Sequence, residues 1–177
     1  MIIVCDTDFL SSFFKIGRLS LVKNFFGEES LYIPVSVFRE IAKTDMITDL
    51  LNKNWVKVKK IDDENLGAEI DDEFTNLGSG EKECIVLCKQ FQDSILLISD
   101  NKARKIAMKR NIIVLNISGF LLACKETGFL NIQEIITIMQ DLKEKGYYEF
   151  SDEEKQRNVY GNGKASENIV EIIGGRE

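Results

Sequence analysis

Short runs dominated by apolar residues recur along the chain, and they restrict the fold more than any other feature of the sequence. Four such runs are IIVC at 2–5, LYIP at 31–34, SILLISD at 94–100 and IIVLN at 112–116. Runs of this length and composition are typical of strands that are buried on both faces of a parallel sheet. Because longer segments with helical spacing separate them, the sequence predicts an α/β fold with a mostly parallel central sheet.

The segments between these runs have the apolar spacing or the end signals of helices. Helices are expected at 9–26 (as one helix or as a pair broken near Gly17), 35–51, 81–92, 101–110, 117–130 (a helix and turn) and 131–145. WVKVKKI at 55–61 alternates apolar and charged residues, which is the pattern of an edge strand. The acidic segments DDEN at 62–65 and DDEFTNLGSGE at 71–81 predict a helix or a loop.

The sequence becomes polar and glycine-bearing from Tyr147 onward, with one short apolar run, NIVEII. A chain of 177 residues is long enough for one domain of ordinary size. We therefore expect one domain at 1–146 and a polar tail or arm at 147–177.

The chain contains no histidine, and its formal net charge is -6. Without histidine, Ser-His-Asp and Cys-His nucleophilic schemes are excluded, and carboxylates are the obvious catalytic groups. Proteins held to nucleic acid mainly by electrostatics are usually basic. The negative charge therefore indicates that any phosphate binding is local or mediated by a metal ion.

The four cysteines lie scattered in apolar segments and form no CxxC pair. We expect buried, reduced thiols rather than a zinc site or disulfides, which is typical of a cytoplasmic protein. No signal-peptide pattern and no apolar stretch of membrane-spanning length is present, so we expect no association with a membrane.

Acidic residues from four segments are expected to meet at one edge of the predicted sheet. Asp6 and Asp100 follow strands, Glu83 lies in the first turn of the helix after GSG, and Glu40 lies on the 35–51 helix. In a parallel sheet the functional crevice lies at the carboxyl ends of the strands. Four carboxylates packed there would repel one another, and a divalent ion would relieve that repulsion. Oxygen ligands suit Mg²⁺ or Mn²⁺, which can activate a water and stabilise a phosphodiester under attack.

Each of these residues also has a simpler interpretation. Asp6 and Asp100 can cap helices, Glu40 can be a solvated surface residue, and the acids of the GSG helix can complement its dipole. Taking the residues together, we predict that the metal ligands are Asp6, Glu40, Glu83 and Asp100, with Glu81 as an additional candidate. Thr7 and Ser99 are predicted to orient a carboxylate or a metal-bound water, although simple turn chemistry also explains them.

Five segments in this order resemble the motifs of PIN-domain nucleases, a family that includes the VapC toxins of toxin–antitoxin pairs. They are IIVCDTDFLSSFFKIGRLSLV, YIPVSVFREI, LGSGEKECIVLC, LLISDNKARKIA and ISGFLLACKETGFL, and together they span roughly residues 1–130. The first places Asp6 as the first acid of the family, with Thr7 at its small hydroxyl position. The following three segments supply Glu40, Glu83 with Glu81 alongside, and Asp100 in turn.

The resemblance implies a three-layer α/β/α sandwich and a metal-dependent endoribonuclease, often dimeric, that leaves 5′-phosphate and 3′-hydroxyl ends. It also implies an RNA substrate and, for a toxin, an antitoxin protein. From its composition, the 147–177 segment is expected to contact an antitoxin or a second subunit. Two positions depart from the family pattern: Asp8 replaces a neutral polar residue, and Ser99 replaces an additional acid. The second departure leaves open whether one or two ions bind.

Basic residues cluster on the helix that begins at Asp100. They are predicted to contact the RNA backbone, together with two residues near Gly17; a solvated helix face is the alternative. The set is Lys102, Arg104, Lys105, Lys15 and Arg18.

Two other functions remain open at this point. The segment VCDTDFL also begins like a haloacid-dehalogenase-like phosphatase, in which Asp6 would be the nucleophile and Asp8 the acid/base. Against this, the usual Gly-Thr is absent and Glu40 and Glu83 would have no role. The second alternative is a non-catalytic PIN-like binding module, which the complete set of four acids disfavours.

Overall fold

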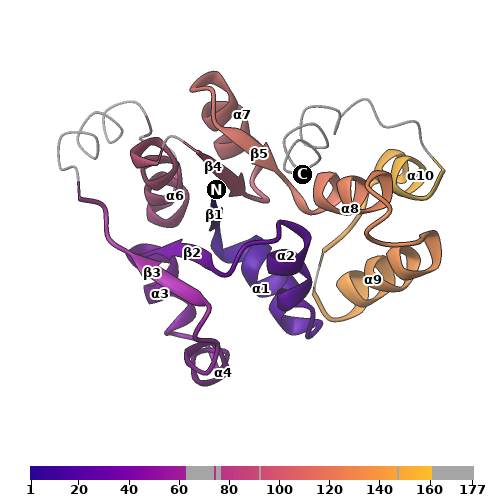
Figure 1. Ribbon diagram of the computed structural model, residues 1–177, viewed down its shortest axis with the longest axis horizontal. Coiled ribbons are helices and arrows are strands. Elements are labelled where there is room, and N and C mark those ends of the chain that lie inside the picture. Colours follow the sequence, from indigo (N-terminus) through magenta and orange to yellow (C-terminus); the bar gives the residue numbers. More distant parts are fainter. Residues whose placement is uncertain (63–73, 75–76, 92, 147, 161–177) are drawn as a thin grey trace. The chain divides into compact units, whose positions relative to one another are not determined.

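The computed structural model describes residues 1–62, 74, 77–91, 93–146 and 148–160, with side chains described up to 156 (Figure 1). The chain divides into two compact units. Unit 1 comprises Met1–Leu10 and Glu28–Leu115, and unit 2 comprises Ser11–Gly27 and the chain from Asn116 onward.

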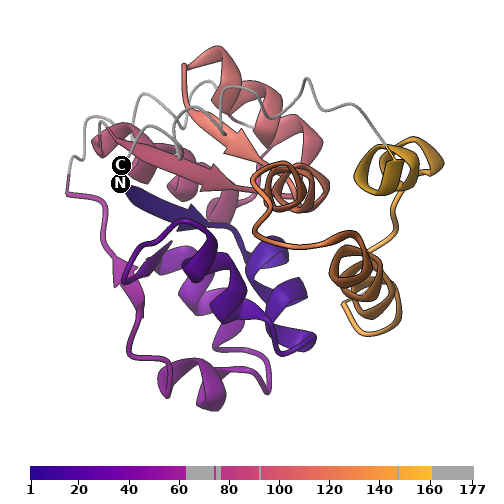
Figure 2. The same ribbon diagram turned by 45° about the vertical axis from the view of Figure 1, so that its right-hand side comes forward.

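Unit 1 is built on a five-stranded sheet in which every strand pair is parallel. The strands lie in the order β3-β2-β1-β4-β5 (Figure 1), and Figure 2 shows β1, β4 and β5 side by side. Their bounds are β1 Ile2–Cys5, β2 Leu31–Pro34, β3 Val56–Lys59, β4 Ser94–Leu97 and β5 Ile113–Leu115. The predicted parallel α/β sheet is confirmed.

The burial of each strand explains its sequence pattern. Strand β1 is central, pairing with β4 from Ile2 opposite Ser94 to Cys5 opposite Leu97, and all of β4 is buried. Strands covered on both faces favour apolar residues, which is why these two read as runs that are apolar apart from Ser94. The alternating VKVK strand β3 lies at one edge of the sheet, as predicted for 55–61.

Helices flank this sheet, in agreement with the predicted α/β/α sandwich. Those of unit 1 are α3 Val35–Ile41, α4 Ile47–Leu51, α6 Ser79–Gln90 and α7 Asn101–Lys109; helix α1 Thr7–Lys15 begins in unit 1 and continues into unit 2. Helix α6 packs against α3 and against the three strands β1, β2 and β4, while α7 packs against β5. The acidic segments at 62–65 and 71–81 lie mostly outside the described residues.

The prediction of one helix over 35–51 is wrong, because α3 and α4 are separate. The Thr44 hydroxyl donates a hydrogen bond to Ile41 O at 2.7 Å and accepts one from Met46 N at 3.3 Å. A threonine that binds the backbone on both sides offers an alternative to the helical ladder. These hydrogen bonds of the Thr44 hydroxyl end α3, and the spacing of apolar residues does not reveal them.

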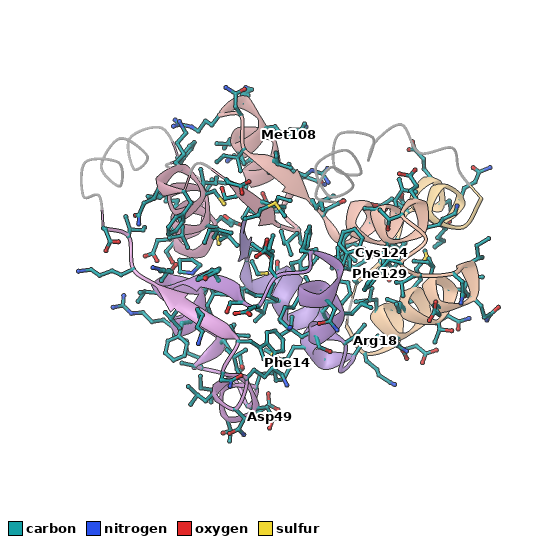
Figure 3. The ribbon with its side chains drawn as sticks, viewed as in Figure 1. Phe14, Arg18, Asp49, Met108, Cys124 and Phe129 are labelled. Atoms are coloured by element: carbon teal, nitrogen blue, oxygen red, sulfur yellow. The ribbon has the colours of Figure 1, made fainter. Side chains whose placement is uncertain are left out.

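Unit 2 is helical and has an aromatic core. Its helices are α2 Leu19–Phe25, α8 Ile117–Glu126, α9 Ile132–Glu144 and α10 Asp152–Tyr160. The ring of Phe120 is fully buried, and its centroid lies 5.3 Å from that of Phe13 and 5.2 Å from that of Phe25. Figure 3 labels Phe129, whose ring adds a further contact with Phe25 at 5.4 Å. Gly17, at φ 70°, separates α1 from α2, which confirms the predicted break.

Helix α10 lies inside the segment predicted to be a polar tail, and it packs against α8 and α9. The boundary at 146 stays a prediction, and residues 161–177 lie outside the described part of the chain.

All four cysteines are buried and free, in agreement with the predicted reduced thiols. Within the described residues, none of the helices combines the length and the hydrophobicity that crossing a bilayer requires.

Candidate functional site

Asp6 joins the carboxyl ends of the two central strands. Its backbone N–H donates to Leu97 O at 2.9 Å, which extends the β1–β4 ladder by one residue. Its Oδ1 accepts a hydrogen bond from Phe9 N at 2.7 Å, and its Oδ2 accepts one from Ser99 N at 2.9 Å. The first bond caps α1, so the capping role considered from the sequence is present. The second bond ties the same carboxylate to the loop after β4.

The Asp6 side chain is only 4% exposed, and its environment opposes ionisation. Burial is the main cause that raises the pKa of its carboxyl from 3.8 to about 7, and the negative charges of Asp8 and Glu81 add to it. The hydrogen bonds from Ser99 and Phe9 oppose this rise. Within the described part of the chain, no lysine or arginine forms an ion pair with Asp6. A bound cation would therefore stabilise the ionised carboxylate.

Asp100 and Ser99 follow β4 at the same edge. Asp100 Oδ1 caps α7 by accepting hydrogen bonds from Lys102 N at 2.8 Å and Ala103 N at 2.7 Å. The Ser99 hydroxyl is the buried side-chain oxygen that has no hydrogen-bond partner among the described residues. The Ser99 backbone N–H, by contrast, donates to the Asp6 carboxylate. A buried, unsatisfied hydroxyl indicates a place for a water molecule.

Glu40 lies between the start of α1 and the first turn of α6. The Thr7 hydroxyl donates a hydrogen bond to Glu40 Oε2. Across from Thr7, the carboxylate approaches Gly80 so closely that a Cβ there would lie 3.1 Å from Glu40 Oε1. Glu40 is half-buried, not the fully solvated residue that the alternative interpretation would have.

Glu81 and Glu83 lie on α6 and have different partners. Glu81 Oε2 accepts a hydrogen bond from Gly78 N at 2.6 Å, which satisfies a free donor at the start of α6. Glu83 Oε2 accepts one from Ser36 N at 2.9 Å, in the first turn of α3. Sequence analysis missed the Glu83–Ser36 contact because the residues are 47 apart along the chain.

Substitutions of Glu83 should measure how much its hydrogen bond to α3 contributes to the stability of the fold. Glu83→Ala removes the acceptor for Ser36 N–H, and we expect the free energy of unfolding to fall by about 1–2 kcal/mol, as for a lost helix cap. Glu83→Gln keeps an oxygen acceptor, so we expect a loss below about 0.5 kcal/mol. Urea unfolding of the metal-free variants measures both values. Losses below about 0.5 kcal/mol in both variants would show that the Ser36 contact adds little to stability.

The predicted acids and hydroxyls all lie in unit 1, and hydrogen bonds join Asp6 to Ser99 and Thr7 to Glu40, whereas Glu81, Glu83 and Asp100 contact backbone groups outside the predicted set. Within the described residues, no three acids or thiols are gathered tightly enough to hold one ion in these side-chain positions. Without a cation, carboxylates repel one another, and the described contacts satisfy them with backbone N–H groups and the Thr7 hydroxyl instead. The donor set is oxygen only, and with the unsatisfied Ser99 hydroxyl it fits a hard, hydrated ion such as Mg²⁺ or Mn²⁺.

The predicted RNA-binding residues fall in both units. Lys102 and Lys105 are exposed on α7, whereas Arg104 is half-buried and donates to Asn101 Oδ1 at 2.7 Å. Lys15 and Arg18 belong to unit 2, where Arg18 Nε lies 3.8 Å from Asp141 Oδ2 (Figure 3). Contact of these side chains with RNA stays a prediction.

Comparison with known proteins agrees with this arrangement. A family profile described as the PIN domain matches residues 2–158, which is most of the chain. Searches of curated proteins and of solved structures returned no match. PIN domains are generally nucleases, and they usually use divalent metal ions. Because the profile matches most of the chain, and because the structure has a parallel sheet with acidic residues at one edge, the chain belongs to the PIN-domain family.

Proposed function

We propose that the protein is a metal-dependent endoribonuclease that hydrolyses RNA phosphodiester bonds. The observation that supports this most strongly is Asp6, a buried carboxylate at the ends of β1 and β4 without a cationic partner among the described residues. Such a group destabilises a fold unless something binds it. Membership of a nuclease family supplies the reaction class.

The proposed ligands of one or two Mg²⁺ or Mn²⁺ ions are Asp6, Glu40, Glu83 and Asp100, with Glu81 as an additional ligand. When bound, such an ion supplies Lewis-acid activation of water and stabilisation of negative charge on phosphate. Asp6 and Asp100 supply carboxylates fixed by backbone N–H groups at a rigid sheet edge. The Ser99 hydroxyl is available to orient a water molecule, and Thr7 orients a carboxylate.

The exposed lysines of α7 are proposed to bind the RNA backbone. Lys102 and Lys105 follow Asp100 by two and five positions, so their ammonium groups can reach phosphates near the acids. Arg104, Lys15 and Arg18 complete the proposed set. Because the overall charge of -6 repels RNA, the attraction must come from these local cations and from the bound ion.

The direct test is cleavage of a panel of structured RNAs by the full-length protein with Mn²⁺, and with EDTA as the control. We expect internal cuts that leave 5′-phosphate and 3′-hydroxyl ends, and no cleavage with EDTA. Cleavage that persists in EDTA, or products with 2′,3′-cyclic phosphate ends, would contradict the proposal.

Asp8→Asn distinguishes the nuclease from the haloacid-dehalogenase-like phosphatase. Asp8 is exposed in the first turn of α1, where the nuclease proposal assigns it no ligand role. We expect the variant to keep RNA cleavage within about threefold, as for most surface substitutions. A phosphatase would lose its general acid and at least about 100-fold of its rate. Assays with RNA and with p-nitrophenyl phosphate measure the two activities.

The non-catalytic alternative and the partners need separate measurements. Calorimetry with Mn²⁺ should show binding to the wild type that weakens in Asp100→Asn; absence of binding would favour a scaffold role.

The proposed toxin role predicts that expression of the protein arrests growth and that a small antitoxin protein relieves the arrest. Light scattering after size exclusion measures the proposed homodimer.

A further inference from the structure

Gly80 is the second residue of α6, and the helix itself gives no reason for a glycine there. Its φ is not positive, unlike those of Gly17, Gly27 and Gly128. Within a helix, glycine is less stable than alanine by about 1 kcal/mol. The reason for a glycine at this position therefore lies outside α6.

The Glu40 carboxylate occupies the space that a side chain at position 80 would need. A Cβ on Gly80 would lie 3.1 Å from Glu40 Oε1, 3.4 Å from Glu40 Oε2 and 3.4 Å from Val37 Cγ2. Gly80 is buried, so an added methyl group could not turn away into solvent. Since Glu40 has a flexible side chain, it would yield first, and its carboxylate would move by a few tenths of an ångström.

Thr7 contacts the same carboxylate from a different element. Its hydroxyl donates to Glu40 Oε2, and Thr7 follows Asp6 directly in the chain. The contact joins α3 to the start of α1 across 33 residues of sequence. Glu40 is thus held by a hydrogen bond from α1 on one side and by the bare backbone of α6 on the other.

We propose that Thr7 and Gly80 are positioning residues that hold the Glu40 carboxylate in place for cation binding. This inference rests on the proposed metal-dependent function; it identifies Glu40 as the carboxylate that Thr7 orients and adds Gly80 as a second residue that acts through it. Thr7 fixes one carboxylate oxygen, and Gly80 permits the close approach to the first turn of α6, where the helix dipole favours a negative charge.

The test compares Gly80→Ala, Thr7→Val and Thr7→Ser by Mn²⁺ calorimetry on the full-length protein. We expect Gly80→Ala and Thr7→Val to weaken Mn²⁺ binding about 10-fold or more, as is usual when a group orienting a ligand is lost. Thr7→Ser keeps the hydroxyl and should bind Mn²⁺ as the wild type does. Ser79→Ala, an exposed position in the same turn, is the matched control and should also bind normally.

Two further measurements distinguish positioning from a general loss of structure. Alanine is the better helix former, so Gly80→Ala should not lower the urea midpoint even though it weakens Mn²⁺ binding. In a Glu40→Gln background, Gly80→Ala should cause no further loss of affinity, because it acts through the residue already changed. A full additional loss in that background would overturn the proposal.

A metal-free measurement separates this inference from the proposed function. The ¹³C resonance of the Glu40 side-chain carboxyl should shift in Gly80→Ala and Thr7→Val, but not in Ser79→Ala. If the wild type fails to bind Mn²⁺ while these shifts occur, the metal-dependent function is wrong and the placement of Glu40 stands. If the wild type binds Mn²⁺, both variants bind equally well and the resonance is unchanged, the positioning roles are wrong.

Discussion

Asp6→Asn is expected to lower kcat/KM for Mn²⁺-dependent RNA cleavage by at least about 1,000-fold, which corresponds to about 4 kcal/mol of transition-state stabilisation. The substitution keeps the size of the side chain but removes the negative charge at the point where β1 and β4 end. An amide has one oxygen, so it can accept only one of the two backbone hydrogen bonds that Asp6 accepts. The variant should therefore lose some stability, while the loss of the negative charge should appear in catalysis and metal binding. Initial rates on a single RNA substrate measure it.

Asp49→Asn is the matched control for this change. Asp49 is an exposed acid on α4 of unit 1, labelled in Figure 3, and its replacement removes the same charge elsewhere. We expect its cleavage rate to stay within about twofold of the wild type. Circular dichroism should show that both variants are folded. If Asp6→Asn keeps more than a tenth of the wild-type rate, Asp6 is not the central ligand.

The stability of the metal-free protein is expected to fall as the pH rises from about 4 to about 7, with Asp6 as the cause. The folded-state pKa of Asp6 is raised from 3.8 to about 7, so in this interval the folded protein binds a proton that the unfolded chain has released. Stability is thus greatest below the unfolded pKa and is lost as the pH passes through the folded one. The difference between the two pKa values corresponds to at most about 4 kcal/mol.

Comparison with Asp6→Asn isolates this contribution, because the asparagine does not titrate. Urea unfolding in EDTA at several pH values should show the wild type losing stability relative to the variant between pH 4 and 7.5. At pH 7.5, Mn²⁺ should raise the melting temperature of the wild type but not that of Asp6→Asn, because an ion bound to the folded state stabilises it. A constant difference between the two proteins across the pH range would show that Asp6 is ionised throughout.

The sequence by itself determined the strands of the sheet and the edge at which Asp6 and Asp100 lie. Continuous apolar runs identified the buried central strands, and alternation identified β3 as an edge strand. These signals succeed because burial on one or two faces acts on every residue of a strand in turn. The positions of Asp6 and Asp100 after β1 and β4 follow from that strand assignment alone.

Only the tertiary structure decided which residues far apart in the sequence the carboxylates contact. Asp6 meets Ser99 across 93 residues, Glu83 meets Ser36 across 47, and Thr7 meets Glu40 across 33. Periodicity is a local signal and reports which face of an element is buried, whereas a hydrogen-bond partner depends on which elements pack together and at what distance. Because α3 and α6 pack closely, Glu83 accepts a hydrogen bond from the first turn of α3, and Glu40 lies against Gly80. No pattern within either helix encodes that approach, because it arises from how both helices pack around the sheet.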